Sequence, residues 1–307
     1  MAPAETRAPD GSAPTLGPGG SHNLDSPIDR TAKLYIGGKQ VRPDADYSLP
    51  VVGAGGGLVA EVPRGSRKDI RNAVEAAHKA VRTWVPRTAH NRAQILYYLA
   101  ENLSARSTEF SDRLEALQGD RPGAEREVEL AVRRLFTYAA WADKWDGRVH
   151  HTPFRNVTLA MPEPIGVMGI VCPDEVPLLG FVSTVAPAIS MGNAVVVVPS
   201  RSGPVMATDL YQVLETSDVP AGVVNIVTGL DSELTAVLAS HDDVDAVWHF
   251  GSAEGGAEVE RLSTGNMKRT WVSNGLPVDW HADEQGQGEE FLWEATQVKN
   301  IWVPYGE

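Results

Sequence analysis

The 307-residue sequence has one cysteine, few basic residues for its acidic content, and no long apolar run. A single cysteine, Cys172, cannot form a disulfide within the chain, so a cytoplasmic, reducing setting is expected. With 27 Lys and Arg against 40 Asp and Glu, the formal net charge is −13, which argues against binding nucleic acid or anionic lipid. No segment reaches the roughly 18 apolar residues that suggest a membrane span.

The first half of the sequence divides into two parts. Residues 1–30 have few large apolar side chains, so we predict a disordered leader. Residues 31–147 begin with β-formers on both sides of Gly37-Gly38, which predicts a hairpin, and continue as a block of four helices, the first capped by Ser66. The glycine-rich run at 53–57 lacks a strand–loop–helix frame, so we do not interpret it as a dinucleotide loop.

The second half has a different pattern. Over residues 164–283 short apolar runs alternate with helical segments, and the run from Val195 to Val198 suits a strand buried on both faces. This alternation predicts an α/β fold, with a Rossmann-like parallel sheet and helices on both faces. Residues 148–163 and the end of 284–307 are rich in β-formers, and the latter range starts as a polar linker.

Several segments resemble the cofactor-binding domain of aldehyde dehydrogenases. They are Ala73–Ala77, Glu163–Val167, Pro187–Ser200, Pro220–Asn225 and Phe250–Ser252. Two more, Cys172–Leu179 and Gln297–Glu307, resemble the non-catalytic C-terminal half of family 16 aldehyde dehydrogenases. The resemblance implies that 148–163 and the end of 284–307 are oligomerisation strands. It also implies that the family's catalytic domain is absent, because only Leu276 to Glu290 stand where it would be inserted.

The resemblance also implies positions for the family's catalytic groups. Glu175 stands where the family has its oxyanion asparagine, and a carboxylate cannot donate a hydrogen bond to an oxyanion. Val272 lies near the position of the general-base glutamate, and no acid is present there. We interpret Cys172, which precedes the position of the family's nucleophile, as a small buried apolar residue. We therefore predict no catalytic residue.

The cofactor positions are altered in the same way. The family's Lys-Pro-Ser-Glu segment, which grips the adenosine end, has neither the lysine nor the glutamate here. Its Phe-Thr-Gly-Ser segment keeps only the glycine and the serine, which open a helix where a pyrophosphate could lie. We expect a degenerate pocket that binds no cofactor and is filled by the imidazole of His249. Its residues are Val198, Arg201, His249, Gly251 and Ser252. The histidines show no metal-ligand spacing, so we predict no metal site.

The C-terminal strand carries the functional prediction. In the family's dimer, as the resemblance implies, this strand extends the catalytic-domain sheet of the partner. The expected interface residues are Gln297, Val298, Lys299, Asn300, Ile301, Trp302, Val303 and Tyr305. We predict a pseudoenzyme: a catalytically inactive accessory subunit, not an enzyme on its own, that pairs with an active NAD(P)-dependent aldehyde dehydrogenase chain holding the cofactor. The alternatives are an NAD(P)-binding sensor or regulatory protein, a purely structural member of an aldehyde-oxidising complex, and an enzyme that uses Cys172.

Overall fold

The computed structural model describes residues 32–305, so the leader predicted for residues 1–30 lies outside the described residues. Its central sheet contains β1 (Leu34–Ile36), β2 (Lys39–Val41), β7 (Val167–Val171), β8 (Ala194–Val198), β9 (Val224–Ile226), β10 (Ala246–His249) and β11 (Arg269–Val272). The strand order is β11-β10-β7-β8-β9-β1-β2. The five strands from β11 to β9 are parallel, and β1 joins β9 antiparallel. The predicted parallel sheet is confirmed.

The apolar runs of the sequence form the centre of this sheet. Every residue of β7 and β8 is buried, as expected for strands with helices on both faces. The predicted N-terminal hairpin is β1 and β2, and its turn residues Gly37 and Gly38 have φ of +62° and +73°, which glycine adopts without steric cost.

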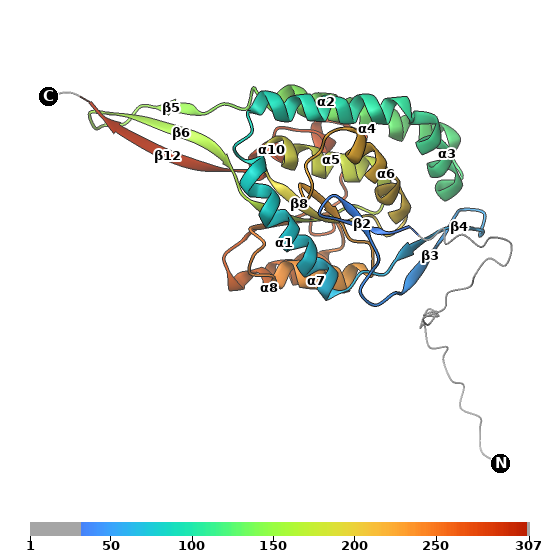
Figure 1. The fold of residues 1–307 in the computed structure, drawn as a ribbon. Coiled ribbons are helices and arrows are strands. Elements are labelled where there is room, and N and C mark those ends of the chain that lie inside the picture. The colour runs from blue at the N-terminus through green and yellow to red at the C-terminus, as the bar shows by residue number, and fades with distance from the viewer. Residues whose placement is uncertain (1–31, 306–307) are drawn as a thin grey trace, which may run out of the picture.

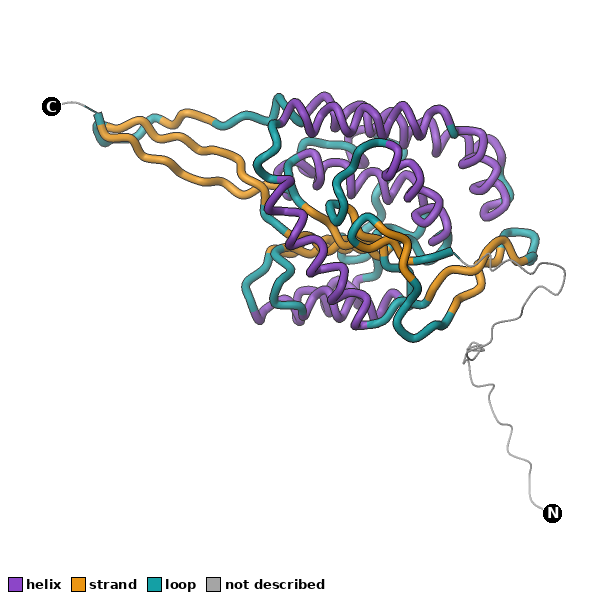
Figure 2. The backbone as a smooth tube through the Cα atoms, in the orientation of Figure 1, coloured by secondary structure: helices purple, strands orange, loops and turns teal. Residues whose placement is uncertain are grey.

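Helices cover both faces of the sheet (Figures 1 and 2). One face packs against α1 (Arg67–Trp84), α7 (Asp231–Ser240) and α8 (Ala253–Leu262), and the other against α5 (Pro177–Ser190) and α6 (Pro204–Thr216). The remaining long helices, α2 (Ala89–Ala105), α3 (Ser107–Gln118) and α4 (Arg121–Trp141), form an outer layer over α5 and α6. No helix within residues 32–305 has the length and apolar character needed to cross a membrane.

The glycine-rich run at 53–57 is the turn of a second hairpin. It joins β3 (Ser48–Val52) to β4 (Leu58–Pro63), and Gly53 donates its N–H to the carbonyl of Gly57 at 3.0 Å. No helix follows the run directly, so the frame of a dinucleotide loop is missing in the structure as well.

A separate three-stranded sheet, which we call the arm, projects from the body (Figure 1). It consists of β5 (Arg148–His150), β6 (Asn156–Pro164) and β12 (Thr296–Pro304), in the order β12-β6-β5. The pairing of β12 with β6 is antiparallel and unbroken, from Thr296 opposite Pro164 to Pro304 opposite Asn156.

One buried side chain ties the base of the arm to the body. The Asn193 Oδ1 accepts the N–H groups of Ile165 (2.7 Å) and Gly166 (3.0 Å), where β6 passes into β7. Its Nδ2 donates to the carbonyls of Ala188 (2.9 Å) and Ala295 (2.8 Å), the latter just before β12. Both long arm strands are therefore anchored to the end of α5 through a single amide.

Residues 273–295, which we call the connecting segment, run from β11 to β12. The segment contains a short turn of helix, α9 (Asp283–Gly286), and α10 (Glu290–Glu294). These turns occupy much of the range in which the sequence predicts a polar linker. The difference arises because Trp280, Phe291 and Leu292 are buried and draw the segment onto the body.

Candidate functional site

The carboxyl ends of β7, β8, β9 and β10 meet at one edge of the sheet, where open α/β sheets bind ligands. After β7, Asp174 accepts the backbone N–H of Arg201 at 2.6 Å and its guanidinium at 2.8 Å. Arg201 is thus held across the edge by a carboxylate that sequence analysis did not single out. Glu175 is exposed, and the Val198 side chain is buried inside β8.

Cys172 follows β7 directly and is buried. Its Sγ lies 3.8 Å from the Thr184 hydroxyl, and burial raises the pKa of the thiol to about 12. The thiol is therefore protonated at neutral pH and lacks the thiolate that nucleophilic attack requires.

The imidazole of His249 packs against the start of α8. A Cβ on Gly251 would lie 2.7 Å from its Cε1, and a Cβ on Gly255 would lie 2.8 Å from both Cε1 and Nε2. The ring therefore fits only because both positions are glycine. Burial lowers the pKa of His249, so the ring is neutral at pH 7, and its Nδ1 has no hydrogen-bond partner among the described residues.

The first turn of α8 is the part of the site that could meet a phosphate. Ser252 caps the helix, and its Oγ accepts the N–H of Gly255 at 3.1 Å. Glu254 stands in the same turn and opposes an anion there, and Asp231 lies in the first turn of neighbouring α7. The structure brings His249, Gly251 and Ser252 together, while Val198 ends β8 and Arg201 follows it, on the far side of β7 from β10.

The position expected for the general base offers no acid. Val272 ends β11 and is half-buried, and the following Ser273 donates its hydroxyl to the Gly251 carbonyl at 3.2 Å. The adjoining Asn274 and Gly275 both have positive φ and turn the chain away from the sheet.

An aromatic cluster covers the ends of β10 and β11. Its members are Trp248, Phe250, Trp271, Trp280 and Phe291, with edge-to-face ring centroids 4.9 Å apart for Trp248–Trp271 and Trp271–Phe291 and 5.1 Å apart for Phe250–Trp280. Trp280 and Phe291 come from the connecting segment, so this segment closes over the sheet edge with apolar rings. Sequence analysis missed the cluster; the only signal was the aromatic character of these scattered positions.

Two buried charged residues hold this region and were also missed. The fully buried guanidinium of Arg134 bonds the Ser183 hydroxyl and the Trp280 carbonyl, and it lies so close to Gly286 that no larger residue fits there. The Glu127 carboxylate accepts the N–H groups of Leu178 (2.8 Å) and Leu179 (3.1 Å) and so caps α5. Burial raises the pKa of Glu127, and these hydrogen bonds oppose the rise.

Comparison with known proteins gives a consistent result. Residues 49–275 match the model of the aldehyde dehydrogenase family. An aldehyde dehydrogenase from Agaricus bisporus is 32% identical over 267 residues, covering 83% of this chain and 53% of that protein. Hydroxyisobutyraldehyde dehydrogenase from Mycolicibacterium austroafricanum is 34% identical over 232 residues, covering 75% and 46%. The chain thus spans about half the length of the curated relatives it matches.

Comparison with solved structures gives a similar partial match. PnpE from Pseudomonas sp. WBC-3 superposes with a TM-score of 0.75 at 26% identity, covering 79% of this chain and 50% of that chain. PnpE in complex with nicotinamide adenine dinucleotide gives a TM-score of 0.76 at 27% identity, covering 78% and 50%.

These findings correct one prediction. From the altered catalytic positions we predicted that the chain is not an enzyme on its own. That prediction is wrong, because the matching family model and relatives are those of enzymes, aldehyde dehydrogenases.

Proposed function

Because the chain belongs to the aldehyde dehydrogenase family, we propose that it works as one subunit of an NAD(P)-dependent aldehyde dehydrogenase assembly, joined through the arm to a chain with a catalytic domain of this family. The observation that carries the proposal is the open edge of β12. Within the described residues β12 pairs with β6 on one side only, along its whole length. A long strand with a free edge is a template for pairing with another chain.

The side chains of the arm support the same role. Cross-strand partners lie on the same face of a sheet, so the register groups Ile301 and Val149 with Leu159, and Val303 with Val157, on one apolar face. Val149 is 73% exposed and Val303 is 49% exposed.

The opposite face of the arm is aromatic. Trp302 is 55% exposed and its ring lies 6.3 Å from that of Phe154. Exposed apolar groups gathered on a projecting element are typical of a protein interface. At the base of the arm, Lys299 and Glu163 form an ion pair at 2.9 Å. The apolar Ile301 and Trp302 lie further toward its tip.

We further propose that the NAD(P) of the assembly is held by the partner chain. The support is the packing of His249 against Gly251 and Gly255, together with Asp231 and Glu254 in the first turns of α7 and α8, where negative charge opposes a pyrophosphate. The single buried thiol fits a cytoplasmic setting.

One observation favours the alternative of an NAD(P)-binding sensor. Ser252 still caps α8 and Gly251 is exposed, so the helix start keeps the geometry that receives a phosphate. Calorimetry with NAD separates the two: micromolar binding by this chain alone supports the sensor, and its absence supports a cofactor on the partner.

The test of pairing is capture of a purified aldehyde dehydrogenase subunit from the same cells by the tagged chain, with aldehyde-dependent NAD(P) reduction measured for each chain and for the mixture. The first variant is a truncated chain that ends at Thr296 and so lacks the rest of β12. The truncation begins at Gln297 because Phe291, Leu292 and Thr296 are buried.

A double variant, Ile301→Lys with Trp302→Lys, changes both faces of the arm while keeping the strand. We expect the truncation to abolish capture and the double variant to weaken it at least tenfold. Leu58→Lys is the matched control, since Leu58 is 61% exposed on the β3–β4 hairpin, and it should capture normally. Full affinity in the truncated chain would overturn the proposal.

A further inference from the structure

A pocket between α1 and α7 has an unusual lining for an acidic protein. Its volume is about 300 Å³, and it is lined by Arg67, Lys68, Arg71, Val237, Ser240 and His241. The lining contains three cationic side chains and no carboxylate, although acidic residues outnumber basic ones in the sequence. It lies on the α1 side of α7, whereas His249 and Ser252 belong to the β10–α8 connection, so it is a different site from the sheet edge.

The two arginines of this pocket are uncompensated. Arg67 and Arg71 are one helical turn apart, so their like charges face the same side of α1 and repel. Among residues 32–305 neither guanidinium has a hydrogen-bond or ion-pair partner. Lys68 pairs with Asp44, and buried Asp69 is occupied by the N–H and hydroxyl of Ser66, so neither acid neutralises the arginines.

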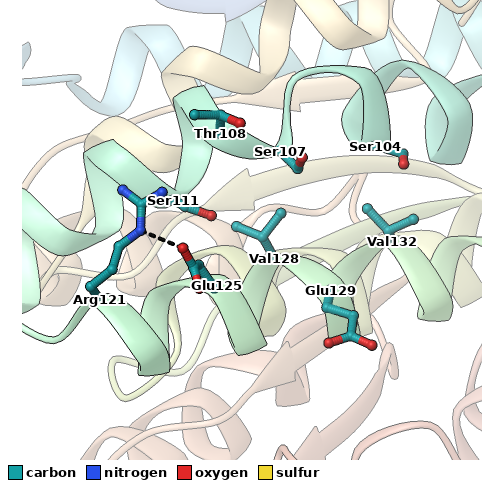
Figure 3. Close-up of a pocket in the computed structure, with 9 residues that line it drawn as sticks. All are labelled: Ser104, Ser107, Thr108, Ser111, Arg121, Glu125, Val128, Glu129 and Val132. Atoms are coloured by element: carbon teal, nitrogen blue, oxygen red, sulfur yellow. Dashed lines mark hydrogen bonds and ion pairs between the residues drawn. The ribbon is translucent and has the colours of Figure 1, made fainter.

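In a second pocket of the molecule, by contrast, the arginine is paired with acids of the same chain. In the groove between the α2–α3 junction and α4, Arg121 pairs with Glu125 (Figure 3). It also pairs with Asp112 and Glu115. The one cation of that pocket is thus paired with carboxylates of the same chain. In the described part of the chain, no carboxylate lines the α1–α7 pocket or pairs with its two arginines; Asp44 pairs with Lys68, and Asp242 and Asp243 adjoin His241. Arg67 and Arg71 are therefore left to meet an anionic ligand.

Two other polar residues line the pocket, Ser240 and His241, and the Ser240 hydroxyl donates to the Ala236 carbonyl at 2.8 Å. The His241 Nδ1 accepts the N–H of Asp243 at 3.2 Å, which leaves the proton of the neutral ring on Nε2. Burial lowers the pKa of His241, so the ring is neutral at pH 7. Two guanidiniums and an N–H donor match the acceptor oxygens of a tetrahedral oxyanion, which arginine binds in bidentate fashion.

We propose that the pocket between α1 and α7 binds a phosphate group, with Arg67 and Arg71 as its principal contacts. The site is independent of the arm and of the sheet edge, so it stands whether or not the proposed pairing is correct.

The experiment is titration calorimetry of the full chain with sodium phosphate at pH 7, at constant ionic strength set with sodium chloride. We expect saturable binding that Arg67→Ala with Arg71→Ala weakens at least tenfold. Arg82→Ala is the matched control, because Arg82 is an exposed arginine of the same helix outside the pocket, and it should bind within twofold of the unmodified chain.

Circular dichroism confirms that the variants fold, which exposed alanines in a helix favour. No saturable binding, or equal binding by the double variant, would overturn the proposal. A repeat with glycerol 3-phosphate identifies the source: tighter binding than phosphate indicates an organic phosphate ester, and equal binding indicates that the phosphate group alone is recognised.

Discussion

Phe291 holds the connecting segment against the sheet, and its truncation is the sharpest test of this packing. The ring is 3% exposed and lies within 6.3 Å of Trp248, Phe250, Trp271 and Trp280. Replacing a core phenylalanine by alanine costs about 3–5 kcal/mol, and the contacts to four rings favour the upper half of that range. We therefore expect Phe291→Ala to lower the free energy of unfolding by about 4 kcal/mol.

Urea unfolding followed by both tryptophan fluorescence and circular dichroism measures this loss, provided that the two transitions coincide. Phe136→Ala is the matched control, because Phe136 is 37% exposed on α4 and, within residues 32–305, contacts the ring of Tyr97 alone. It should cost less than about 1.5 kcal/mol. If Phe291→Ala costs no more than this control, the connecting segment is not held by its rings, and our account of the covered sheet edge is wrong.

Two further predictions follow from the packing of single residues. Gly255→Val drives a side chain into the His249 ring, so we expect the free energy of unfolding in urea to fall by about 1–3 kcal/mol. His249→Ala should largely restore this loss, and an equal loss with and without the His249 ring would contradict the contact. Because burial raises the pKa of Glu127 above its unfolded value, the stability that it contributes is greatest at low pH and is lost as pH rises through the folded pKa. The unfolding free energy of the unmodified chain relative to Glu127→Gln should thus increase as pH falls from 7 to 5, and a difference that does not vary with pH would refute this assignment.

Much of the sheet could be predicted because its strands have a local signal. Val167–Val171 and Ala194–Val198 are short apolar stretches between turn residues, and both are strands of the central sheet. The Gly37-Gly38 turn identifies the first hairpin for the same reason, since its φ values require glycine.

The groups that hold the site together had no such signal. Glu127 lies among other charged residues of α4, so the sequence predicts a solvent-facing side chain. Packing against α5 buries it instead. Trp280 and Phe291 lie in a polar stretch, so only the folded chain shows that they meet Phe250. Contacts between residues this far apart in sequence depend on tertiary structure, which local patterns do not encode.

Asn193 gives the arm a mechanical property. Its amide joins the end of β6 and the start of β12 to the end of α5, so the two long strands leave the body from one fixed point. A force applied at the tip of the arm acts as a torque on that point, and these four hydrogen bonds resist it. If a chain adds a strand to β12 as we propose, the buried Asn193 amide helps to set the angle between that chain and the central sheet.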